Sequence, residues 1–498
     1  MTQDVVVGID LGTTVLKAAV FGAKDGRLVG QSACRLPVRH LPDGGQELSA
    51  AAIDKAFRRV VAELSQRAGK RWRRVCGVGL AAQGGSNLIA DRTTGRPRTA
   101  MILWNDARAR LCVARLAAQA DKRFWRRLFM FDMPPTGLGR LMWLKERHPE
   151  LFRDEFIHIG AGEYLFHRLT GVWRQDAGNA IQIGSYNART RKLVGAALDL
   201  AGVPVSFVAP LRKGHETSPL SREGARLLGV EEEIPVAGPY IDQEACYMAA
   251  LGATARPLQC SLGTAWVGNF ELPHGIQGSS PSQMVLPGPT GAGKLVVQPL
   301  YTGNSAWDWA LDAFVDHDHA KALEQAAAVF ARRILSPDGL VCIPWCMQPN
   351  PFNTAAYGAG MFLGVSTRTT TEDMLRATAA GLVYDLGRVF GDLKTKGVID
   401  GVVLYGGASK ASYYRRLVAS VFAPTPVLWQ RDYDVAAARG AVLALSPCAA
   451  HGNVEPISVR GVEADEVKRA YELYVAAFER VLGPVPDTGP FRCRRGSR

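Results

Sequence analysis

One strand-and-turn unit occurs twice in this chain, and this repetition restricts the possible folds more than any other feature. Near the N-terminus, the β-branched run Val5–Ile9 leads into the turn Asp10-Leu11-Gly12-Thr13-Thr14, and a second strand is predicted over Val15–Phe21. The tripeptide Leu-Gly-Thr returns in Ser261-Leu262-Gly263-Thr264, just after a predicted boundary at 254–257, which indicates an internal duplication. Because 498 residues exceed what one hydrophobic core usually supports, each half is expected to form its own lobe.

The tips of these two hairpins have the groups that bind phosphate. A tight turn exposes backbone N–H groups, and threonine adds hydroxyl donors beside them. Two such hairpins, one from each half, could hold a triphosphate between them. For the carboxylate of Asp10, a cap of its own turn is the alternative interpretation. No Gly-x4-Gly-Lys-Ser/Thr loop occurs in the sequence, so a phosphate-binding loop of that type is not predicted.

Three further strands are predicted to end in polar residues, which is where α/β folds bind ligands. Val75–Leu80 leads into the glycine-rich loop Ala81–Asn87, and a strand near Ala100–Leu103 leads into Trp104-Asn105-Asp106-Ala107-Arg108. The third strand ends at Asp242. Its carboxylate could accept a proton from an alcohol, although an aspartate before a helix is more often an N-cap.

The second half contains one more strand, which ends in glycines, and several helices. Gly401–Tyr405 leads into the turn Gly406-Gly407-Ala408, where missing side chains would let a flat adenine approach the backbone; a simple tight turn is the alternative. A helix near Val462–Leu482 has an apolar face and could dock on its own domain or form a dimer contact. Other helical stretches are predicted at 50–68, 111–169 (mainly helical, with an interruption at 134–137), 243–253, 307–314, 371–396, 411–422 and 435–445.

Composition and spacing exclude several classes of protein. The net charge of +13 favours acidic partners, but the basic clusters Arg58–Arg74 and Lys122–Arg127 coincide with predicted helices and have no nucleic-acid-binding motif. We therefore predict no nucleic-acid partner. No apolar run is long enough to span a membrane, and no signal peptide is evident. The nine cysteines are scattered without zinc-ligand spacing, which predicts a reduced, cytoplasmic protein with no membrane partner.

Taken together, the motifs resemble those of the FGGY carbohydrate kinases over residues 5–446. The first phosphate motif of that family is similar to Gly8–Thr14 with Lys17, and its Trp-x-Asp-x-Arg element is similar to Trp104–Arg108. The other matches are the sugar loop at 81–86, the second phosphate motif at Asp242, the Gly-Thr element at Gly263-Thr264 and the adenosine motif at Gly406-Gly407-Ala408. The order and spacing of the set are far more specific than any single motif.

The resemblance implies an α/β fold of two actin-like, ribonuclease H-like lobes with a cleft between them. The N-terminal lobe, 1–245, would carry the sugar site and the first phosphate motif, and the C-terminal lobe, 254–446, would bind the adenosine of ATP. Residues 447–498 would form an extension with one amphipathic helix and a basic tail, disordered from 486. The implied activity is phosphotransfer from ATP to an alcohol group with Mg²⁺, in a protein that could be a homodimer.

The same resemblance implies roles for individual residues. Asp242 would be the catalytic base that deprotonates the sugar hydroxyl, and Asp10 would hold Mg²⁺. For Arg108, a structural ion pair with Asp106 is the alternative to contact with the sugar. The implied ATP- and phosphate-binding residues are Asp10, Gly12, Thr13, Thr14, Lys17, Gly263, Thr264, Gly406, Gly407 and Ala408. The implied substrate-binding or supporting residues are Gln83, Gly84, Gly85, Asp106, Arg108 and Asp242.

The motifs are most similar to those of xylulose kinases, but the residues of the sugar loop differ from theirs. They usually carry Gln-Met-His-Gly where this chain has Gln83-Gly84-Gly85-Ser86, so the pocket is predicted to be roomier or to have different donors. We expect a kinase of a ketopentose such as D-xylulose, giving the 5-phosphate, with another ketose, a deoxy sugar or a polyol as alternatives. A different class is a non-catalytic nucleotide-binding regulator on the same fold. The presence of Asp10, Asp242 and the glycine turn argues against that class.

Overall fold

The first strand is buried on both of its faces and organises the first of two units. In the computed structural model, which describes residues 4–129, 132–273, 283–291, 293–300, 302–337, 339–346, 358–450 and 452–482, β1 spans Val5–Leu11. A strand covered on both sides has a continuous apolar run rather than an alternating one, as this strand does. The described residues divide into a first unit within 1–252, 284–295 and 435–452 and a second unit within 253–283, 296–434 and 453–498.

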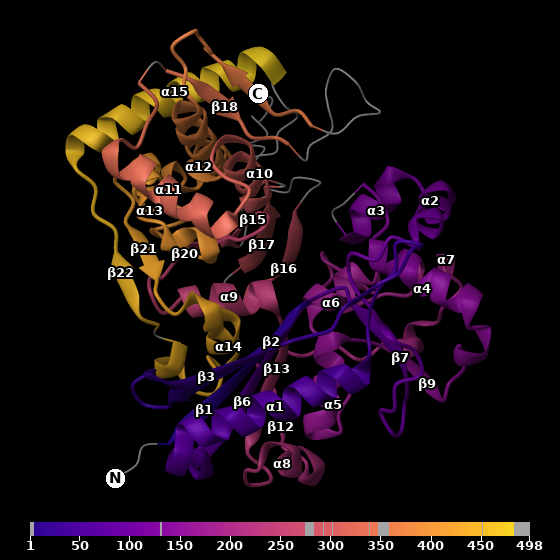
Figure 1. Ribbon diagram of the computed structural model, residues 1–498. Helices are drawn as coiled ribbons and strands as arrows, with labels where there is room; N and C mark the ends of the chain where they lie inside the picture. Colours follow the sequence, from indigo (N-terminus) through magenta and orange to yellow (C-terminus); the bar gives the residue numbers. More distant parts are fainter. Residues whose placement is uncertain are drawn as a thin grey trace, which may run out of the picture. The chain divides into compact units, whose positions relative to one another are not determined.

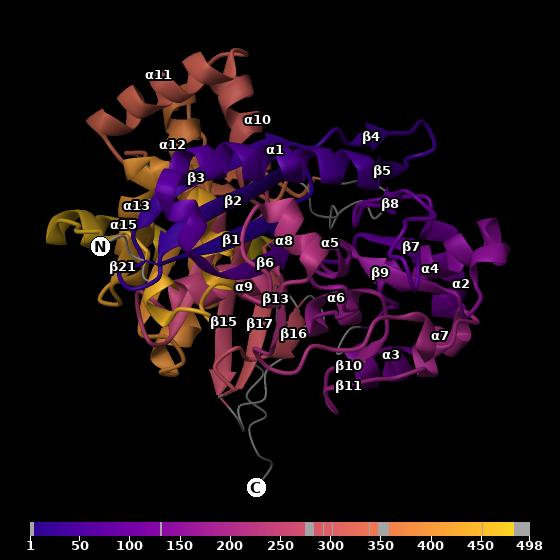
Figure 2. The ribbon, with the colours of Figure 1, turned by 90° about the horizontal axis from the view of Figure 1, so that it is seen from below.

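The main sheet of the first unit has the strand order β12-β13-β6-β1-β2-β3. β1 is antiparallel to β2 and parallel to β6, which is itself parallel to β13. Helices α1, α5 and α8 cover one face, and α9 and α14 cover the other (Figure 1; Figure 2). These elements span Val15–Gly22 (β2), Leu28–Arg35 (β3), Val75–Ala82 (β6), Thr217–Pro219 (β12), Pro235–Ile241 (β13), Ala50–Ala68 (α1), Ala161–Thr170 (α5), Arg222–Leu228 (α8), Asp242–Ala250 (α9) and Ala436–Ala441 (α14).

Helix α14 lies against this sheet at backbone distance, although it comes from the far end of the sequence (Figure 1). A Cβ atom on Gly8 would overlap the carbonyl of Ala438, and one on Gly79 would also overlap the backbone of α14. On α14 itself, Gly440 meets a backbone carbonyl of α9 in the same way. Only glycine allows such an approach. The last helix of the predicted 254–446 lobe is thus part of the first unit.

The predicted helix at 50–68 is confirmed, whereas the predicted helical stretch at 111–169 is wrong in one part. α1 begins after Ser49, whose side chain accepts the N–H of Ala52. Within the helical stretch, β9 pairs with β7 in a smaller sheet of order β4-β5-β8-β7-β9. The remaining elements of this unit span Arg39–His40 (β4), Gln46–Leu48 (β5), Asn87–Asp91 (β7), Met101–Ile102 (β8), Phe156–Gly160 (β9), Tyr186–Asn187 (β10), Lys192–Leu193 (β11), Met284–Pro287 (β16), Arg110–Gln119 (α2), Lys122–Phe129 (α3), Thr136–Arg147 (α4), Ala177–Gln182 (α6) and Ala196–Leu200 (α7).

The sheet of the second unit repeats the first, which confirms the predicted internal duplication. This sheet has the order β16-β17-β15-β14-β20-β21-β22, and its strands from β17 to β22 correspond to β3-β2-β1-β6-β13-β12. In both, an antiparallel hairpin is followed by two parallel pairings and an antiparallel edge strand. The strands span Pro257–Leu262 (β14), Trp266–Pro273 (β15), Gly293–Pro299 (β17), Gly401–Tyr405 (β20), Val427–Gln430 (β21) and Val454–Pro456 (β22), and a separate pair Val341–Ile343 (β18) and Met361–Leu363 (β19).

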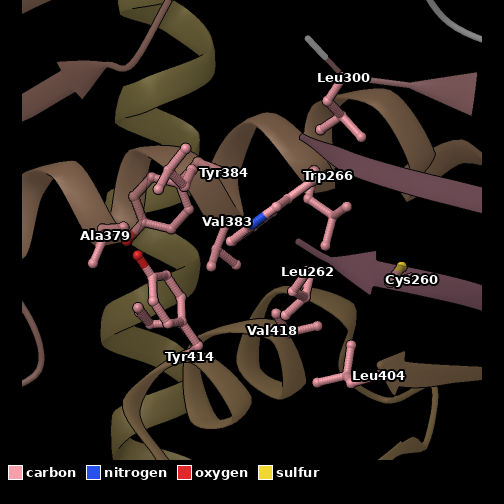
Figure 3. Close-up of a cluster of buried hydrophobic side chains, with 14 of the residues drawn as sticks. Cys260, Leu262, Trp266, Leu300, Ala379, Val383, Tyr384, Leu404, Tyr414 and Val418 are labelled. Carbon is pink, nitrogen blue, oxygen red and sulfur yellow. The ribbon is translucent and has the colours of Figure 1, made fainter. Parts of the chain in front are cut away.

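Helices pack on this second sheet around a core of aromatic and aliphatic side chains. Figure 3 shows Trp266 and Leu262 of the sheet facing Tyr384 and Tyr414 of the helices. The C-terminal helix α15 packs against α12 and α13 (Figure 1) and buries Tyr474 in the same core. Of the two alternatives for this helix, docking on its own domain is therefore confirmed. The helices span Asn304–Phe314 (α10), His319–Arg332 (α11), Thr371–Thr395 (α12), Ser412–Phe422 (α13) and Gly461–Leu482 (α15); the predicted disordered tail from 486 lies outside the described residues.

Candidate active site

Three neighbouring parallel strands of the first unit end together, and polar residues stand at their ends. In the register of the sheet, Asp10 on β1 lies beside Ala81 on β6, which lies beside Tyr240 on β13. Gln83 follows β6 directly, and Asp242 follows β13 directly. Because neighbouring strands are about 4.8 Å apart, Asp10 and Asp242 stand on strands whose axes are separated by about 10 Å. The sheet thus places two carboxylates at one edge, on either side of a glycine-rich loop.

Both carboxyl groups have raised pKa values. Burial raises the pKa of Asp10 to about 6, against the opposing effect of Lys17, its cross-strand partner on β2. Burial and then the charge of Asp10 raise the pKa of Asp242 to about 7. Both residues keep some exposed surface, as a ligand site requires. A carboxyl group with a pKa near 7 is suited to accept a proton at neutral pH.

The alternative interpretations of the two aspartates as simple caps do not fit these contacts. The N-cap of α9 is Ile241, and Asp242 is the first helical residue, with Oδ1 accepting the N–H of Gln243 at 2.8 Å. The N-cap interpretation of Asp242 is therefore wrong. Asp10 lies within β1, and its buried Oδ1 has no hydrogen-bond partner in the described part of the chain. An unpartnered carboxylate oxygen is costly unless a ligand completes it.

Gln83 connects the first hairpin tip to the glycine-rich loop. Its Oε1 accepts hydrogen bonds from the hydroxyls of Thr13 at 2.8 Å and Ser86 at 2.9 Å, and its Nε2 donates to the carbonyl of Gly12 at 3.3 Å. Its carboxamide is thus used within the protein, so Gln83 supports the site. Thr14 at the tip is exposed. The tip therefore keeps a free hydroxyl and a rigid backbone available for a ligand.

Two residues that the sequence analysis missed hold the glycine-rich loop from behind. The Oδ1 of Asn179 on α6 accepts the N–H of Gly85 at 3.1 Å. The buried guanidinium of Arg140 on α4 donates to the carbonyls of Gly85 at 2.6 Å and Trp104 at 2.8 Å. Desolvation lowers the pKa of Arg140 to about 10, so it remains charged at neutral pH. An arginine on an otherwise apolar helix face has no local sequence signal for this role.

Trp104 is a further site residue that was quoted in a motif but not predicted to bind. Its side chain is 51 % exposed, which is unusual for so large an apolar group. The indole N–H donates to Thr13 Oγ1 at 3.1 Å, and the backbone N–H donates to Ser86 Oγ at 2.9 Å. The exposed ring therefore lies between the tip of the first hairpin and the glycine-rich loop. Such a ring offers a flat apolar face to the C–H groups of a sugar or polyol.

Asp106 and Arg108 form an ion-pair cluster instead of facing open space. Arg108 donates to Asp106 Oδ2 at 2.7 Å and to Glu47 Oε1 at 2.9 Å, and its guanidinium lies over the ring of Trp143. Asp106 Oδ2 also accepts the N–H of Gln46 at 2.8 Å. The observed contacts match the structural alternative stated for this pair. They fix the segment that carries Trp104.

The hairpin tip of the second unit repeats the first in form. Leu262 pairs with Trp266 across the turn Gly263-Thr264-Ala265, and the Thr264 side chain is exposed. The N–H groups of Asn304 and Ser305, at the start of α10, donate to the carbonyls of Gly263 and Thr264 at 3.1 and 3.2 Å. The tip is thus held by the first turn of a helix, and Thr264 is free to meet a ligand.

A cavity of 660 Å³ in the second unit adjoins the predicted adenosine motif. Gly406 has a φ of 89°, and a Cβ atom there would lie 2.7 Å from the backbone of Leu262, so only glycine fits. Gly407 has open space where its side chain would be. The lining comes from α10, α11 and the segment 407–416, including Trp307, Asp308, His319, Phe330, Gly407, Ala408, Lys410 and Tyr414. Its size suits a nucleoside.

Family models match almost the whole chain. The N-terminal domain of the FGGY family of carbohydrate kinases matches residues 5–252, and the C-terminal domain matches residues 258–446. The chain belongs to the FGGY family of carbohydrate kinases. This membership identifies the protein as a sugar or polyol phosphotransferase of a family that uses ATP. Its two main sheets belong to the two ribonuclease H-like domains of the FGGY fold.

Named relatives within the FGGY family act on different substrates. A glycerol kinase from Acaryochloris marina is 26% identical over 422 residues, 80% of this chain and 78% of that protein. An erythritol kinase from Brucella abortus is 25% identical in an alignment of 525 positions, gaps included, that covers 97% of each protein. The crystal structure of a xylulose kinase from Rhodospirillum rubrum has a TM-score of 0.81 and 20% identity, covering 96% of this chain and 99% of that chain.

Two features can be stated of the described residues of this FGGY kinase. Within them, no group of three or more His, Cys, Asp or Glu side chains could hold a metal ion. None of the described helices is both long and apolar enough to cross a membrane.

Proposed function

We propose that this FGGY kinase transfers the γ-phosphoryl group of ATP to a terminal hydroxyl of a small neutral polyol or ketose, with Asp242 as the general base. The observation that carries the proposal is the pair Asp10 and Asp242 at the ends of β1 and β13, the two strands that flank β6, with a pKa near 7 for Asp242. At neutral pH, a base with this pKa is partly deprotonated and is still basic enough to accept a proton from a hydroxyl group.

Each residue has a defined task in the transfer. Asp242 accepts the proton of the substrate hydroxyl as its oxygen attacks the γ-phosphorus; the new O–P bond forms while the bond to the β-phosphate oxygen breaks, and ADP leaves. The ATP-binding residues are Gly263, Thr264, Gly406, Gly407 and Ala408 on the second unit and Gly12, Thr13, Thr14 and Lys17 on the first. Transfer requires that nucleotide and substrate meet at Asp242.

The environment of Asp10 supports a role in holding Mg²⁺. Its buried Oδ1 has no partner among the described residues, and Lys17 is the positive charge that opposes the rise in its pKa. Mg²⁺ typically binds through one or two carboxylates, waters and substrate phosphates. When bound, the ion would neutralise phosphate charge. Asp10 would hold it directly or through water.

The charges around the glycine-rich loop favour an uncharged substrate. Arg140, which holds the loop, and Arg108, which fixes the segment that carries Trp104, already bind carboxylates or backbone carbonyls. Neither is available for a substrate carboxylate, which would have to be desolvated without a partner. D-xylulose, erythritol and glycerol are therefore the first candidates, the last two because of the named relatives. An aldonate such as gluconate is disfavoured.

A coupled ADP-release assay tests this proposal. Purified protein with Mg-ATP would be given D-xylulose, erythritol, glycerol and gluconate in parallel, with Asp242→Asn as the control. We expect ADP release that depends on one of the neutral compounds and falls by at least about 100-fold in the variant, the usual contribution of a general base. Equal activity of the variant would refute the role of Asp242. If the protein binds ATP but releases no ADP with any of the four compounds, the alternative of a non-catalytic nucleotide-binding regulator would be favoured.

A further inference from the structure

The space above the glycine-rich loop is not empty, although Gly84 and Gly85 have no side chains. A Cβ atom on Gly84 would overlap Nε2 of Gln182 and would lie 2.5 Å from Ile241 Cδ1. A Cβ atom on Gly85, whose φ is 74°, would overlap Oε1 of the same glutamine. The carboxamide of Gln182 thus stands where side chains of the loop would otherwise stand. The sequence of the loop predicts a pocket that is roomier or has different donors, and a donor and an acceptor from another element occupy that space.

Helix α6 holds Gln182 in this position firmly. The helix begins after Asp176, whose side chain accepts the N–H of Asn179. Asn179 in turn accepts the N–H of Gly85 at 3.1 Å. Asn179 and Gln182 are three residues apart and therefore lie on one face of the helix. A Cβ atom on Gly137 of α4 would overlap the carbonyl of Gln182, so the backbone of α6 cannot move toward α4.

The carboxamide of Gln182 has little to bind within the protein. Within the described part of the chain, it makes one hydrogen bond, from Nε2 to the thioether of Met284 at 3.8 Å, and a thioether is a weak acceptor. By contrast, the carboxamide oxygen and nitrogen of Gln83 both form hydrogen bonds with oxygen groups of the protein. The carboxamide of Asn179 likewise accepts from the backbone of Gly85 and donates to Glu163. Gln182 is also partly exposed. It is therefore a partly exposed carboxamide with capacity left for a ligand, whereas Asn87 of the loop, which also has an unpartnered oxygen, is fully buried.

We propose that Gln182 selects the substrate by binding two adjacent hydroxyl groups next to the one that is phosphorylated. A carboxamide presents an acceptor and a donor side by side, which matches a vicinal diol, in which each hydroxyl both donates and accepts. This inference rests on the proposed kinase activity and sharpens its substrate class to neutral polyols or ketoses with a vicinal diol. A monodeoxy analogue at that diol would leave one carboxamide atom unpaired and be discriminated against.

Kinetics of Gln182→Met test the inference, because methionine keeps the length and shape of the side chain but removes the carboxamide. Wild type, Gln182→Met and the control Gln119→Ala, on an exposed residue of α2, would be compared on the best polyol and on its monodeoxy analogue. We expect kcat/KM for the polyol to fall about 10- to 100-fold, mainly through KM. The preference for polyol over analogue should fall toward unity, while the KM for ATP and the unfolding temperature stay as in the control.

Two outcomes would overturn the inference. One is an unchanged preference in Gln182→Met, with kcat/KM within about twofold of wild type. The other is an equal loss on polyol and analogue, which indicates a structural role. A binding measurement separates this failure from failure of the proposed function: polyol-induced stabilisation of wild type that Gln182→Met lacks supports the inference even without turnover, and its absence in wild type overturns it.

Discussion

Replacing Asp242 by asparagine is expected to inactivate the enzyme and yet to stabilise it at alkaline pH. The fold holds this carboxyl in a desolvated position beside Asp10, which raises its pKa from 3.8 to about 7. A difference of that size corresponds to about 4 kcal/mol against the charged form. This is an upper value, because Asp242 keeps some exposed surface and the unfolded chain is not fully hydrated.

The sign of the effect follows from proton binding. A carboxyl with a raised pKa binds its proton more tightly in the folded state, so between about pH 4 and pH 7 the folded protein carries more protons than the unfolded chain. The contribution of Asp242 to stability therefore decreases as pH rises through this window and stays low above it. Asparagine does not ionise, but burying its amide costs about 1–3 kcal/mol. We expect a net gain of about 1–3 kcal/mol at pH 8 and none at pH 4.

Urea unfolding of wild type and Asp242→Asn at pH 4, 6 and 8 measures this difference directly. Asp154→Asn is the matched control, because Asp154 is an exposed carboxylate of the same unit. The pH dependence of kcat/KM in wild type should show a matching loss of activity below an apparent pKa near 7. A variant that is destabilised equally at all three pH values would refute the reasoning, since it would mean that Asp242 acts through packing or hydrogen bonds and not through its charge.

Three other predictions concern magnesium, the nucleotide cavity and the C-terminal helix. Asp10→Asn should raise the Mg²⁺ concentration for half-maximal ADP release about 10- to 100-fold; an unchanged Mg²⁺ titration contradicts the role of Asp10. Gly407→Val should raise the KM for ATP about tenfold without altering the unfolding temperature, because the side chain enters the cavity. Gly406→Ala should instead lower the unfolding temperature. If the two variants had similar effects on KM and on the unfolding temperature, the assignment of the cavity to ATP would be contradicted. Phe478→Ala removes a buried side chain of α15 and should cost about 3–5 kcal/mol in unfolding free energy, and a loss below about 1 kcal/mol would show that α15 does not complete this core.

Much of the fold could be predicted because its signals are local. The repeated strand and Gly-Thr turn predicted two similar halves, and the sheets do repeat the same order of strands. The helix at 50–68 has its cap and its apolar periodicity within the segment itself. Asp242 could be found for the same reason, since it directly follows the predicted strand. In each case, neighbouring residues carry the information.

The parts of the fold that were predicted wrongly depend on contacts with segments far away in the sequence. Phe156–Gly160 forms a strand because β7 offers it an edge, and nothing within the five residues separates it from the helices around it. Helix α14 returns to the first unit because glycines on β1 and β6 leave room for its backbone. Such close contacts are a property of two segments together.

The sequence by itself determined the duplicated hairpins, the ends of the strands and the aspartates that stand there, because strand and turn preferences act over a few residues. Only the tertiary structure decided what surrounds the glycine-rich loop. Gln182 fills the space of two missing side chains, and Arg140 holds the loop carbonyls, from helices about 50 to 100 residues along the chain. A pocket is lined by whatever side chains the folded chain brings together, so its chemistry depends on contacts that no single segment contains.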